Sequence, residues 1–333
     1  MKKSGCAIIA LFLALCVSIF VNGSLLLGMK LGTSVSSGVR TEQPKKFEEQ
    51  IVVDGDGSGK IVVIPLEGII SFGAKGALGD SLVDDLKAAF RQAEEDSTVK
   101  AVVMTVDSPG GEVTASDAIY HEIQRFARHK PVVYFMNSIG ASGAYYAACG
   151  ASWVMCNDTT FTGSIGVIIS TLNYRDLFGK IGLQSVVFKS GKFKDLLNGA
   201  REMTPEEQEY VQSLVMQSYG RFVGIVAKAR KIDENSLRTG VADGRILSGT
   251  DAYQAKLVDQ LGYVEDAYAK ARQLGDAPKA SVVLYKRSFS FSNVFQLFGE
   301  SSQAKTDVHI DLLQQMPELK PGHMYLLPPF YAP

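Results

Sequence analysis

The sequence predicts an α/β protein built on a largely parallel sheet. Short apolar runs alternate with amphipathic helical stretches between about residues 60 and 275. A continuous apolar run suits a strand that is covered on both faces, and strands that alternate with helices indicate βαβ crossovers. The runs expected to form strands are 60–66, 101–106, 131–136, 153–156 and 185–188.

Helical signals separate these strands. Residues 80–95 carry apolar side chains at helical spacing, and residues 113–129 are expected to form a second helix. The clearest helix start is 204–207, where a capping threonine precedes a proline at the first position and a glutamate at the third. This start predicts a helix to about Ala229, and a shorter helix is expected over 248–261.

Composition excludes several classes of function. The chain has 333 residues, 46% of them hydrophobic, which is enough for one or two globular domains with a proper core. A formal net charge of −1 provides no electrostatic case for nucleic acid binding. Cys149 and Cys156 lie in apolar settings and are expected to be core residues, without the partners of a metal site. We therefore expect no metal and no cofactor.

The N-terminal segment has the character of a membrane anchor. Residues 6–31 are almost uncharged and follow Lys2 and Lys3, and their length fits a helix that crosses a bilayer. Small residues before Ser24 leave a cleaved signal peptide as the alternative, but the apolar run continues to Leu27. The two lysines place the N-terminus in the cytoplasm. We expect a single-pass protein of the inner (plasma) membrane, in contact with lipid, with its folded part on the periplasmic (extracytoplasmic) side.

The remaining chain divides by composition. Residues 1–31 are the anchor or signal segment, and 32–59 are rich in Gly, Ser and charged residues, which is typical of a linker. Residues 60–290 are expected to form the folded domain. The C-terminal tail, 291–333, contains five prolines and has no clear secondary-structure pattern: Pro317, Pro321, Pro328, Pro329 and Pro333.

A serine in a glycine-rich turn is the first candidate for chemistry. Ser142 follows the strand expected at 131–136, lies between Gly140 and Gly143, and precedes an apolar helix-like run. A serine at a helix start commonly caps the first turn. It can also be a nucleophile, because the unpaired N–H groups of that turn can hold an oxyanion. Both interpretations remain open from this stretch alone.

Histidine is the usual base for a serine nucleophile, but the four histidines fit this role poorly. His121 and His129 fall on a predicted helix, and His309 and His323 lie in the tail. None of them lies in a glycine-rich turn at the end of a predicted strand. A Ser-His-Asp triad is therefore unsupported.

Lysine is the alternative base, provided that its amine is kept neutral in surroundings that exclude water. The segment 189–199 contains Lys189, Lys192 and Lys194. By composition alone this segment is a solvated basic loop, since exposure is the norm for lysine.

Seven short motifs occur in an order that is specific, although each of them alone is weak. They span residues 107–111, 141–143, 162–167, 189–195, 201–207, 244–249 and 255–259. With these motifs the chain resembles the signal peptide peptidase A family in its short bacterial form. The resemblance covers most of residues 60–275. It implies a serine-lysine dyad peptidase with the Clp protease/crotonase-like fold, which consists of repeated ββα units with a parallel sheet, and an N-terminal transmembrane helix.

The resemblance implies roles for three side chains. Ser142 matches the family nucleophile, and Lys194 matches the general base. Ser164 matches the serine whose hydroxyl helps to hold the lysine, although by itself it reads as a turn residue between glycines. Lys192 competes with Lys194, because residues two apart in a strand share a face.

The resemblance also implies an oxyanion hole made by the turn at Gly110 and Gly111 together with the N–H of Gly143. Glycines allow close approach of a substrate backbone. Gly110 is slightly favoured over Gly111, but the sequence does not separate them, and a plain Pro-Gly turn is the alternative.

The implied activity is hydrolysis of peptide bonds through an acyl-enzyme, with remnant signal peptides and other unfolded peptides as substrates. The family assembles as a ring-like homo-oligomer, an octamer in the short form, so Ser142 and Lys194 are expected to come from one chain or from two neighbouring chains. Two alternatives are a crotonase-like acyl-CoA enzyme and a catalytically inactive membrane scaffold.

Overall fold

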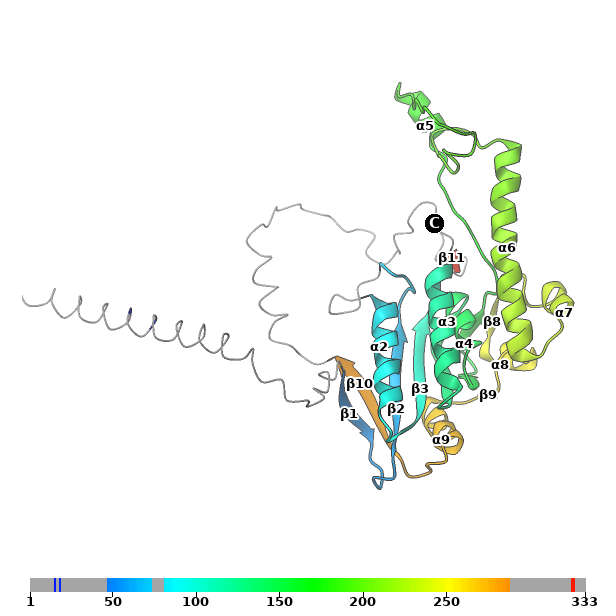
Figure 1. The fold of residues 1–333 in the computed structure, drawn as a ribbon. Coiled ribbons are helices and arrows are strands. Elements are labelled where there is room, and N and C mark those ends of the chain that lie inside the picture. Colours follow the sequence, from blue (N-terminus) through cyan, green and yellow to red (C-terminus); the bar gives the residue numbers. More distant parts are fainter. Residues whose placement is uncertain (1–14, 16–17, 19–46, 74–80, 288–324, 327–333) are drawn as a thin grey trace, which may run out of the picture. The chain divides into compact units, whose positions relative to one another are not determined.

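The fold lies in the second of two units into which the chain divides, Met1–Pro44 and Lys45–Pro333. The computed structural model describes Leu15, Ser18 and residues 47–73, 81–287 and 325–326 (Figure 1). Residues from Phe47 onward form a sheet with helices on its faces.

The sheet has nine strands among the described residues, in the order β1-β10-β2-β3-β5-β6-β9, with β7 beside β5 and β8 beside β7. The strands are β1 (Phe47–Val53), β2 (Lys60–Glu67), β3 (Val99–Ser108), β5 (Val132–Ala141), β6 (Trp153–Cys156), β7 (Phe161–Gly163), β8 (Ile246–Ser248), β9 (Gln260–Leu261) and β10 (Ser281–Arg287). Two shorter strands, β4 (Gly111–Glu112) and β11 (Tyr325–Leu326), pair with each other.

Most strand pairs are parallel, as the alternation of strands and helices predicts. The antiparallel pairs of the large sheet are β1 with β10 and β7 with β8. Helices connect the strands: α2 (Leu82–Glu95), α3 (Val113–Ala127), α4 (Gly143–Ala148), α5 (Arg175–Lys180), α6 (Pro205–Arg230), α7 (Glu234–Thr239), α8 (Gly249–Gln254) and α9 (Val264–Leu274).

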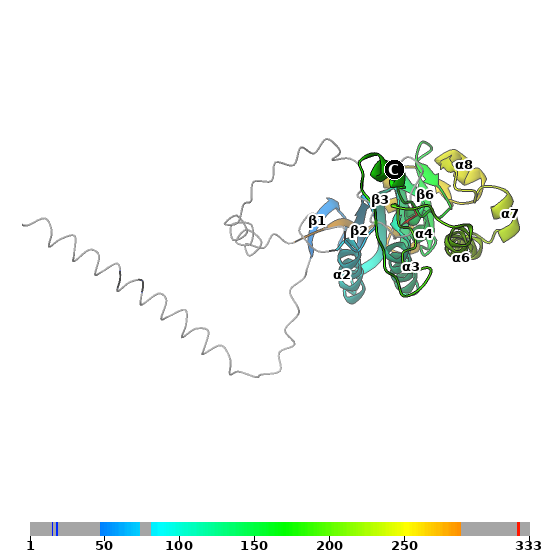
Figure 2. The same ribbon diagram turned by 90° about the horizontal axis from the view of Figure 1, so that it is seen from above.

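Alternating side chains of the central strands face two separate cores. Val62 of β2 and Met104 of β3 belong to the core that also contains residues of α2, α3 and α4. Ile61 and Val103 belong to the smaller core with α9. This burial on both faces explains why the strands are continuous apolar runs. Figure 2 shows α2 and α3 side by side on one face of the strands.

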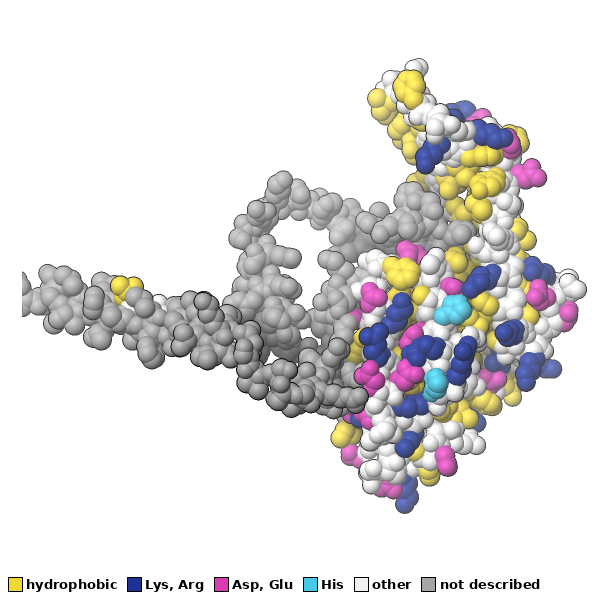
Figure 3. Space-filling view, in the orientation of Figure 1, with side chains coloured by type: hydrophobic (Ala, Val, Ile, Leu, Met, Phe, Trp, Pro, Cys, Tyr) yellow, Lys and Arg dark blue, Asp and Glu magenta, His cyan; other side chains and the backbone are white. Residues whose placement is uncertain are grey.

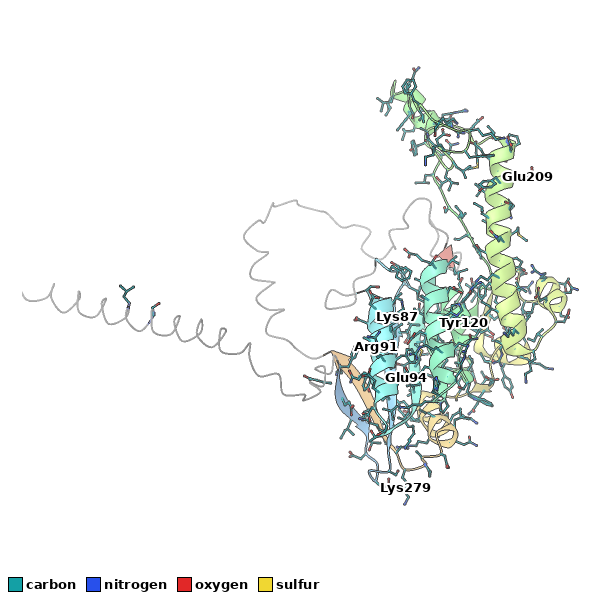
Figure 4. All side chains as sticks on the ribbon, viewed as in Figure 1. Lys87, Arg91, Glu94, Tyr120, Glu209 and Lys279 are labelled. Carbon is teal, nitrogen blue, oxygen red and sulfur yellow. The ribbon has the colours of Figure 1, made fainter. Side chains whose placement is uncertain are left out.

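The outer surface of α2 and α3 is charged. Lys87, Arg91 and Glu94 follow one another along α2 (Figure 4). Glu94 forms an ion pair of 2.6 Å with Arg125 of α3, which joins the two helices at the surface. These side chains keep the exposed face of the layer polar, as expected for amphipathic helices.

The long helix α6 begins where the sequence predicts. The Thr204 hydroxyl accepts a hydrogen bond of 3.3 Å from the N–H of Glu207, and the Glu207 carboxylate accepts one of 2.8 Å from the N–H of Thr204. This reciprocal cap fixes the first turn. Helix α8 is shorter than predicted, because it ends at Gln254.

One sequence prediction about a boundary is wrong. The segment 32–59, predicted as linker, contains strand β1, which pairs with β10 from Phe47 onward, so the domain starts before residue 60. β1 lies at the edge of the sheet, and only Phe47 of its side chains is buried, so its charged residues conceal the strand pattern. In the predicted tail, 291–333, only β11 is described.

The strand predicted at 185–188 does not form. Val186 and Phe188 are 73% and 96% exposed, and the segment makes no sheet pairing. It belongs to residues 168–203, here called the arm, which contains α5 and extends past the end of the sheet to the start of α6 (Figure 1). The apolar run therefore does not mark burial within this chain.

Other predictions concern the membrane and the cysteines. Over the part of the chain that the structure places, no helix is long and apolar enough to cross a membrane. The predicted anchor, 1–31, lies outside that part except for Leu15 and Ser18. Cys149 and Cys156 are buried free thiols, as predicted, and burial raises the pKa of each to about 12.

Candidate functional site

Ser142 occupies a strained turn between β5 and α4. Its φ and ψ are 54° and −114°, a region that residues other than glycine rarely adopt, and it is fully buried. Two hydrogen bonds of 2.8 Å hold the backbone. The N–H of Ser142 donates to the carbonyl of Gly163, and the N–H of Tyr146 donates to the carbonyl of Ser142. The hydroxyl makes no cap bond and has no hydrogen-bond partner among the residues that the structure describes. The capping interpretation is therefore wrong, and the hydroxyl is available for chemistry.

Side chains brace this turn from both sides. The Thr162 hydroxyl donates to the carbonyl of Gly140 at 2.7 Å, and the Tyr134 hydroxyl donates to the carbonyl of Ala144 at 2.8 Å. A backbone conformation that costs free energy persists only where its surroundings fix it. These two bonds fix the backbone two residues before and two residues after Ser142.

Asp107 helps to position the turn at Ser142, a role that sequence reasoning missed. Its carboxylate accepts hydrogen bonds from the side chain of Asn137 at 2.9 Å and from the N–H of Ser138 at 2.7 Å. It thus ties the end of β3 to the segment of β5 that leads into Ser142. The sequence does contain a signal for this role. Asp107 stands at the end of β3, and the end of β3 lies beside the end of the parallel strand β5.

Ser164 lies next to Ser142 across a strand pair. β5 and β7 are parallel, and Ala141 pairs with Gly163, so each serine follows a paired residue. Ser164 has a φ of 50° and is 3% exposed, and its N–H donates to the carbonyl of Arg245 at 2.8 Å. The structure therefore brings the two predicted serines to adjacent strand ends.

The three predicted glycines converge beside Ser142. A β-carbon added to Gly110, whose φ is 103°, would lie 2.6 Å from the amide nitrogen of Gly143, and one added to Gly143 would lie 3.0 Å from that of Gly111. The N–H of Gly110 donates to the Ser108 hydroxyl at 3.2 Å. The N–H groups of Gly111 and Gly143 are therefore the better candidates for an oxyanion hole, with Gly110 providing the close approach.

A peptide carbonyl reaches this place in the structure. Strand β11 pairs antiparallel with β4, and Leu326 pairs with Gly111. The carbonyl oxygen of Leu326 lies 2.1 Å from the point where a β-carbon of Gly110 would be. On the other side of β4, Ile70 exchanges backbone bonds of 2.8 Å with Gly110 and Glu112. The glycine turn thus accepts an extended chain along one edge.

The arm distinguishes the three lysines. Lys189 forms an ion pair of 2.6 Å with Asp195, and Lys192 forms one with Glu206. The side chain of Lys194 is exposed and makes no hydrogen bond or ion pair with any residue that the structure places. Of these three amines, only that of Lys194 has no partner among the described residues, which favours Lys194 over Lys192 as the candidate base.

An ion-pair network holds the Lys194 segment to the start of α6. Arg201 bonds to Asp195 at 2.8 and 2.9 Å and to Glu207 at 2.8 and 2.6 Å. The Arg201 guanidinium lowers the pKa of Glu207 to about 2 and, with help from Lys189, holds the pKa of Asp195 below its usual range. Glu207 also caps α6, so the network connects the backbone next to Lys194 to a rigid helix.

The histidines within the placed part of the chain do not approach this site. His121 is exposed and lies 3.6 Å from Asp117, and His129 is exposed near the end of α3. Figure 3 shows imidazoles among charged side chains on the outer surface. His309 and His323 lie outside the described residues. Where the structure places side chains, it also contains no cluster of His, Cys, Asp and Glu that could hold a metal.

Comparisons with known proteins identify relatives of this chain. The family model described as Peptidase family S49 matches residues 124–277, and the one for Clp protease matches residues 67–156. A putative protease of Synechocystis is 37% identical over 74% of this chain and 86% of its own length. A putative signal peptide peptidase SppA of Enterococcus faecium is 35% identical over 72% of this chain and 71% of its own.

The chain belongs to peptidase family S49. It is thus a serine peptidase with a Clp protease-like α/β fold. A further relative, a putative protease of Methanocaldococcus jannaschii, is 38% identical over 62% of this chain. This alignment spans 63% of the length of that relative. The alignment with Protease 4 of Salmonella typhi spans 37% of the length of Protease 4.

The network on the arm predicts a defined acid limit. The folded pKa of Glu207, about 2, lies below its usual value of 4.5, so the stabilisation is complete above about pH 4.5 and is lost as the pH falls towards 2. Amide hydrogen exchange over residues 189–207, corrected for intrinsic rates, should show constant protection from about pH 5 to pH 9.

Replacement Arg201→Met is the matched control, and it should remove this protection already at neutral pH. A loss of protection in the unaltered chain between about pH 5 and pH 7 would contradict the network as described.

Proposed function

We propose that this S49 peptidase is a membrane-anchored endopeptidase that uses Ser142 and Lys194 to hydrolyse remnant signal peptides and other unfolded peptides. One observation carries the proposal. The buried hydroxyl of Ser142 has no hydrogen-bond partner in the described part of the chain, and it lies next to glycine N–H groups that a peptide carbonyl already approaches. Nucleophile, electrophile and donors are the three elements that acyl transfer requires.

The chemistry follows from these positions. The neutral amine of Lys194 accepts the proton of Ser142 as its Oγ attacks the carbonyl carbon of the substrate. The N–H groups of Gly111 and Gly143 stabilise the oxyanion, with Gly110 allowing the approach. The ammonium then returns its proton to the leaving amine, and the same lysine activates the water that hydrolyses the acyl-enzyme. Ser164 is suited to orient the amine.

The class of substrate is suggested by how β11 binds. An extended chain adds to β4 through backbone hydrogen bonds, a mode that demands little of the sequence. The side chain of Leu326 is 1% exposed, so this position accepts a branched apolar residue. Signal peptides are rich in such residues. They remain near the membrane, and an enzyme tethered by residues 6–31 on the extracytoplasmic side would encounter them there.

The arm suggests why one chain is insufficient. It exposes apolar side chains that no part of the placed chain covers: Leu172, Leu177, Ile181, Leu183, Val186 and Phe188. Figure 3 shows hydrophobic side chains gathered on the arm. A patch of this kind is typical of an interface between chains. Lys194 lies on the same arm, and its amine needs surroundings without water to act as a base.

We therefore propose a homo-oligomer in which the arm of one chain packs on its neighbour and supplies Lys194 to the neighbour's Ser142. A closed ring satisfies every arm with the same contact. The octamer expected from the resemblance is a ring of this type. No observation favours the alternative of an acyl-CoA enzyme, because the chain belongs to a peptidase family. Labelling of Ser142 distinguishes an active peptidase from an inactive scaffold.

The dyad predicts selective loss of activity. Lys194→Ala should lower kcat for an unfolded protein substrate by about 10²–10⁴-fold, whereas Lys192→Ala, which removes only the pair with Glu206, should change it little. A fluorophosphonate should label Ser142 in the unaltered chain, as read by intact mass. Activity should rise towards alkaline pH.

Three outcomes would contradict the dyad. They are full activity in Lys194→Ala, absence of labelling at every pH, which would favour the inactive scaffold, and a pH profile that breaks only near about 6.5, which would point to histidine.

A mixing experiment tests whether two chains share each site. Ser142→Ala and Lys194→Ala chains are each inactive in this account. When they are unfolded, mixed in equal amounts and reassembled, about one quarter of the sites should combine an intact serine with an intact lysine from the neighbour. Reassembly of each variant alone is the control. No recovered activity, with assemblies of mixed composition shown by native mass spectrometry, would place both residues in one chain.

A further inference from the structure

Ser116 is a buried residue that the proposed chemistry has not used. It lies on the inner face of α3 with Ile119 and Tyr120 and is fully buried. Its hydroxyl has no hydrogen-bond partner in the described part of the chain. A serine inside a helix usually donates to the carbonyl four residues earlier, and buried polar groups are nearly always paired. An unpaired hydroxyl in such a place requires an explanation.

The hydroxyl of Ser116 lies against the oxyanion donors. A β-carbon added to Gly143 would lie 2.4 Å from Ser116 Oγ, 3.0 Å from the nitrogen of Gly111 and 3.3 Å from the α-carbon of Gly110. The Ser116 hydroxyl and the nitrogen of Gly111 thus both lie beside Gly143. Ser142 Oγ, on the residue before Gly143, is the other unpaired buried hydroxyl at this site.

We propose that the Ser116 hydroxyl is a third donor to the oxyanion that forms when Ser142 attacks. The inference rests on the proposed function. The carbonyl of Leu326 already approaches Gly110 and Gly143, yet Ser116 makes no hydrogen bond to it. On attack the carbon becomes tetrahedral, and the oxygen shifts and gains negative charge. A donor that bonds only to this displaced oxygen stabilises the transition state more than bound substrate, and so increases kcat.

The role as oxyanion donor and a purely structural role of Ser116 predict different effects of its replacement on stability. Replacing a buried, unpaired hydroxyl by hydrogen leaves no polar group unsatisfied, so Ser116→Ala should not lower the melting temperature. If the serine were needed for packing, the same replacement would reduce stability and activity together. Stability and turnover therefore separate the two roles.

The test compares Ser116→Ala with Ser81→Ala, which removes another buried, unpaired serine hydroxyl, at the start of α2. In Ser116→Ala, kcat for a peptide substrate should fall about 10²-fold with KM nearly unchanged. Inhibition by a peptide aldehyde, which forms a tetrahedral adduct with Ser142, should weaken by a similar factor, whereas a peptide with a reduced, non-hydrolysable bond should bind equally well. Ser116→Cys should fall in between, since a thiol is a weaker donor. Ser81→Ala should behave as the unaltered enzyme does.

Unchanged kcat in Ser116→Ala would overturn the inference, and so would a loss of kcat accompanied by a lower melting temperature. An equal loss of affinity for the aldehyde and for the reduced peptide would overturn it as well. The proposed function is tested separately by Ser142→Ala. If that variant is inactive while Ser116→Ala is fully active, only the third donor is excluded. If Ser142→Ala stays active, the proposed function itself fails.

Discussion

The parallel pairing of β5 with β7 is the constraint on which the proposed site depends. It places Ser142 beside Ser164 and allows the N–H of Ser142 to donate to the carbonyl of Gly163 at 2.8 Å. This bond and the braces from Thr162 and Tyr134 maintain a backbone conformation that Ser142 would not otherwise adopt. As a result the hydroxyl makes no cap bond, and no described residue of the core is its hydrogen-bond partner.

The other components of the site differ in how firmly they are fixed. The glycine turn is enclosed by β11 and by Ile70, so its donors are set before a substrate arrives. The lysine lies on an arm whose apolar side chains are exposed, although the network around Arg201 orders its backbone. In the proposed oligomer this division would tie activity to assembly, because the packed arm would supply the surroundings without water that a neutral amine requires. An enzyme of this kind would be inactive until its arms are packed.

The sequence predicts the parts of this molecule whose signal is local. Strands covered on both faces appear as apolar runs, the cap at Thr204 has a defined pattern, and the turn around Ser142 is marked by glycines. The sequence does not predict β1, because an edge strand exposes most of its side chains. It predicts a buried strand at 185–188, where the structure has none, because the apolar side chains of the arm are not covered by any described part of the chain. The contacts of Ser116 arise only when distant elements pack together, so no sequence pattern predicts them, whereas those of Asp107 are indicated only by its place at the end of a strand.

The central claim is that the amine of Lys194 in one chain reaches the hydroxyl of Ser142 in its neighbour. The most direct measurement is a cross-link between Ser142→Cys and Lys194→Cys placed in the same chain, with Cys6 and Cys16 replaced by Ser. A short bifunctional thiol reagent is used, because a lysine side chain reaches farther than a cysteine and a direct disulfide would need α-carbons within about 7 Å. After denaturation, the proposed dyad predicts a ladder of covalently linked chains, which either single variant should lack. A cross-link confined to single chains, or none in an intact assembly, would contradict it.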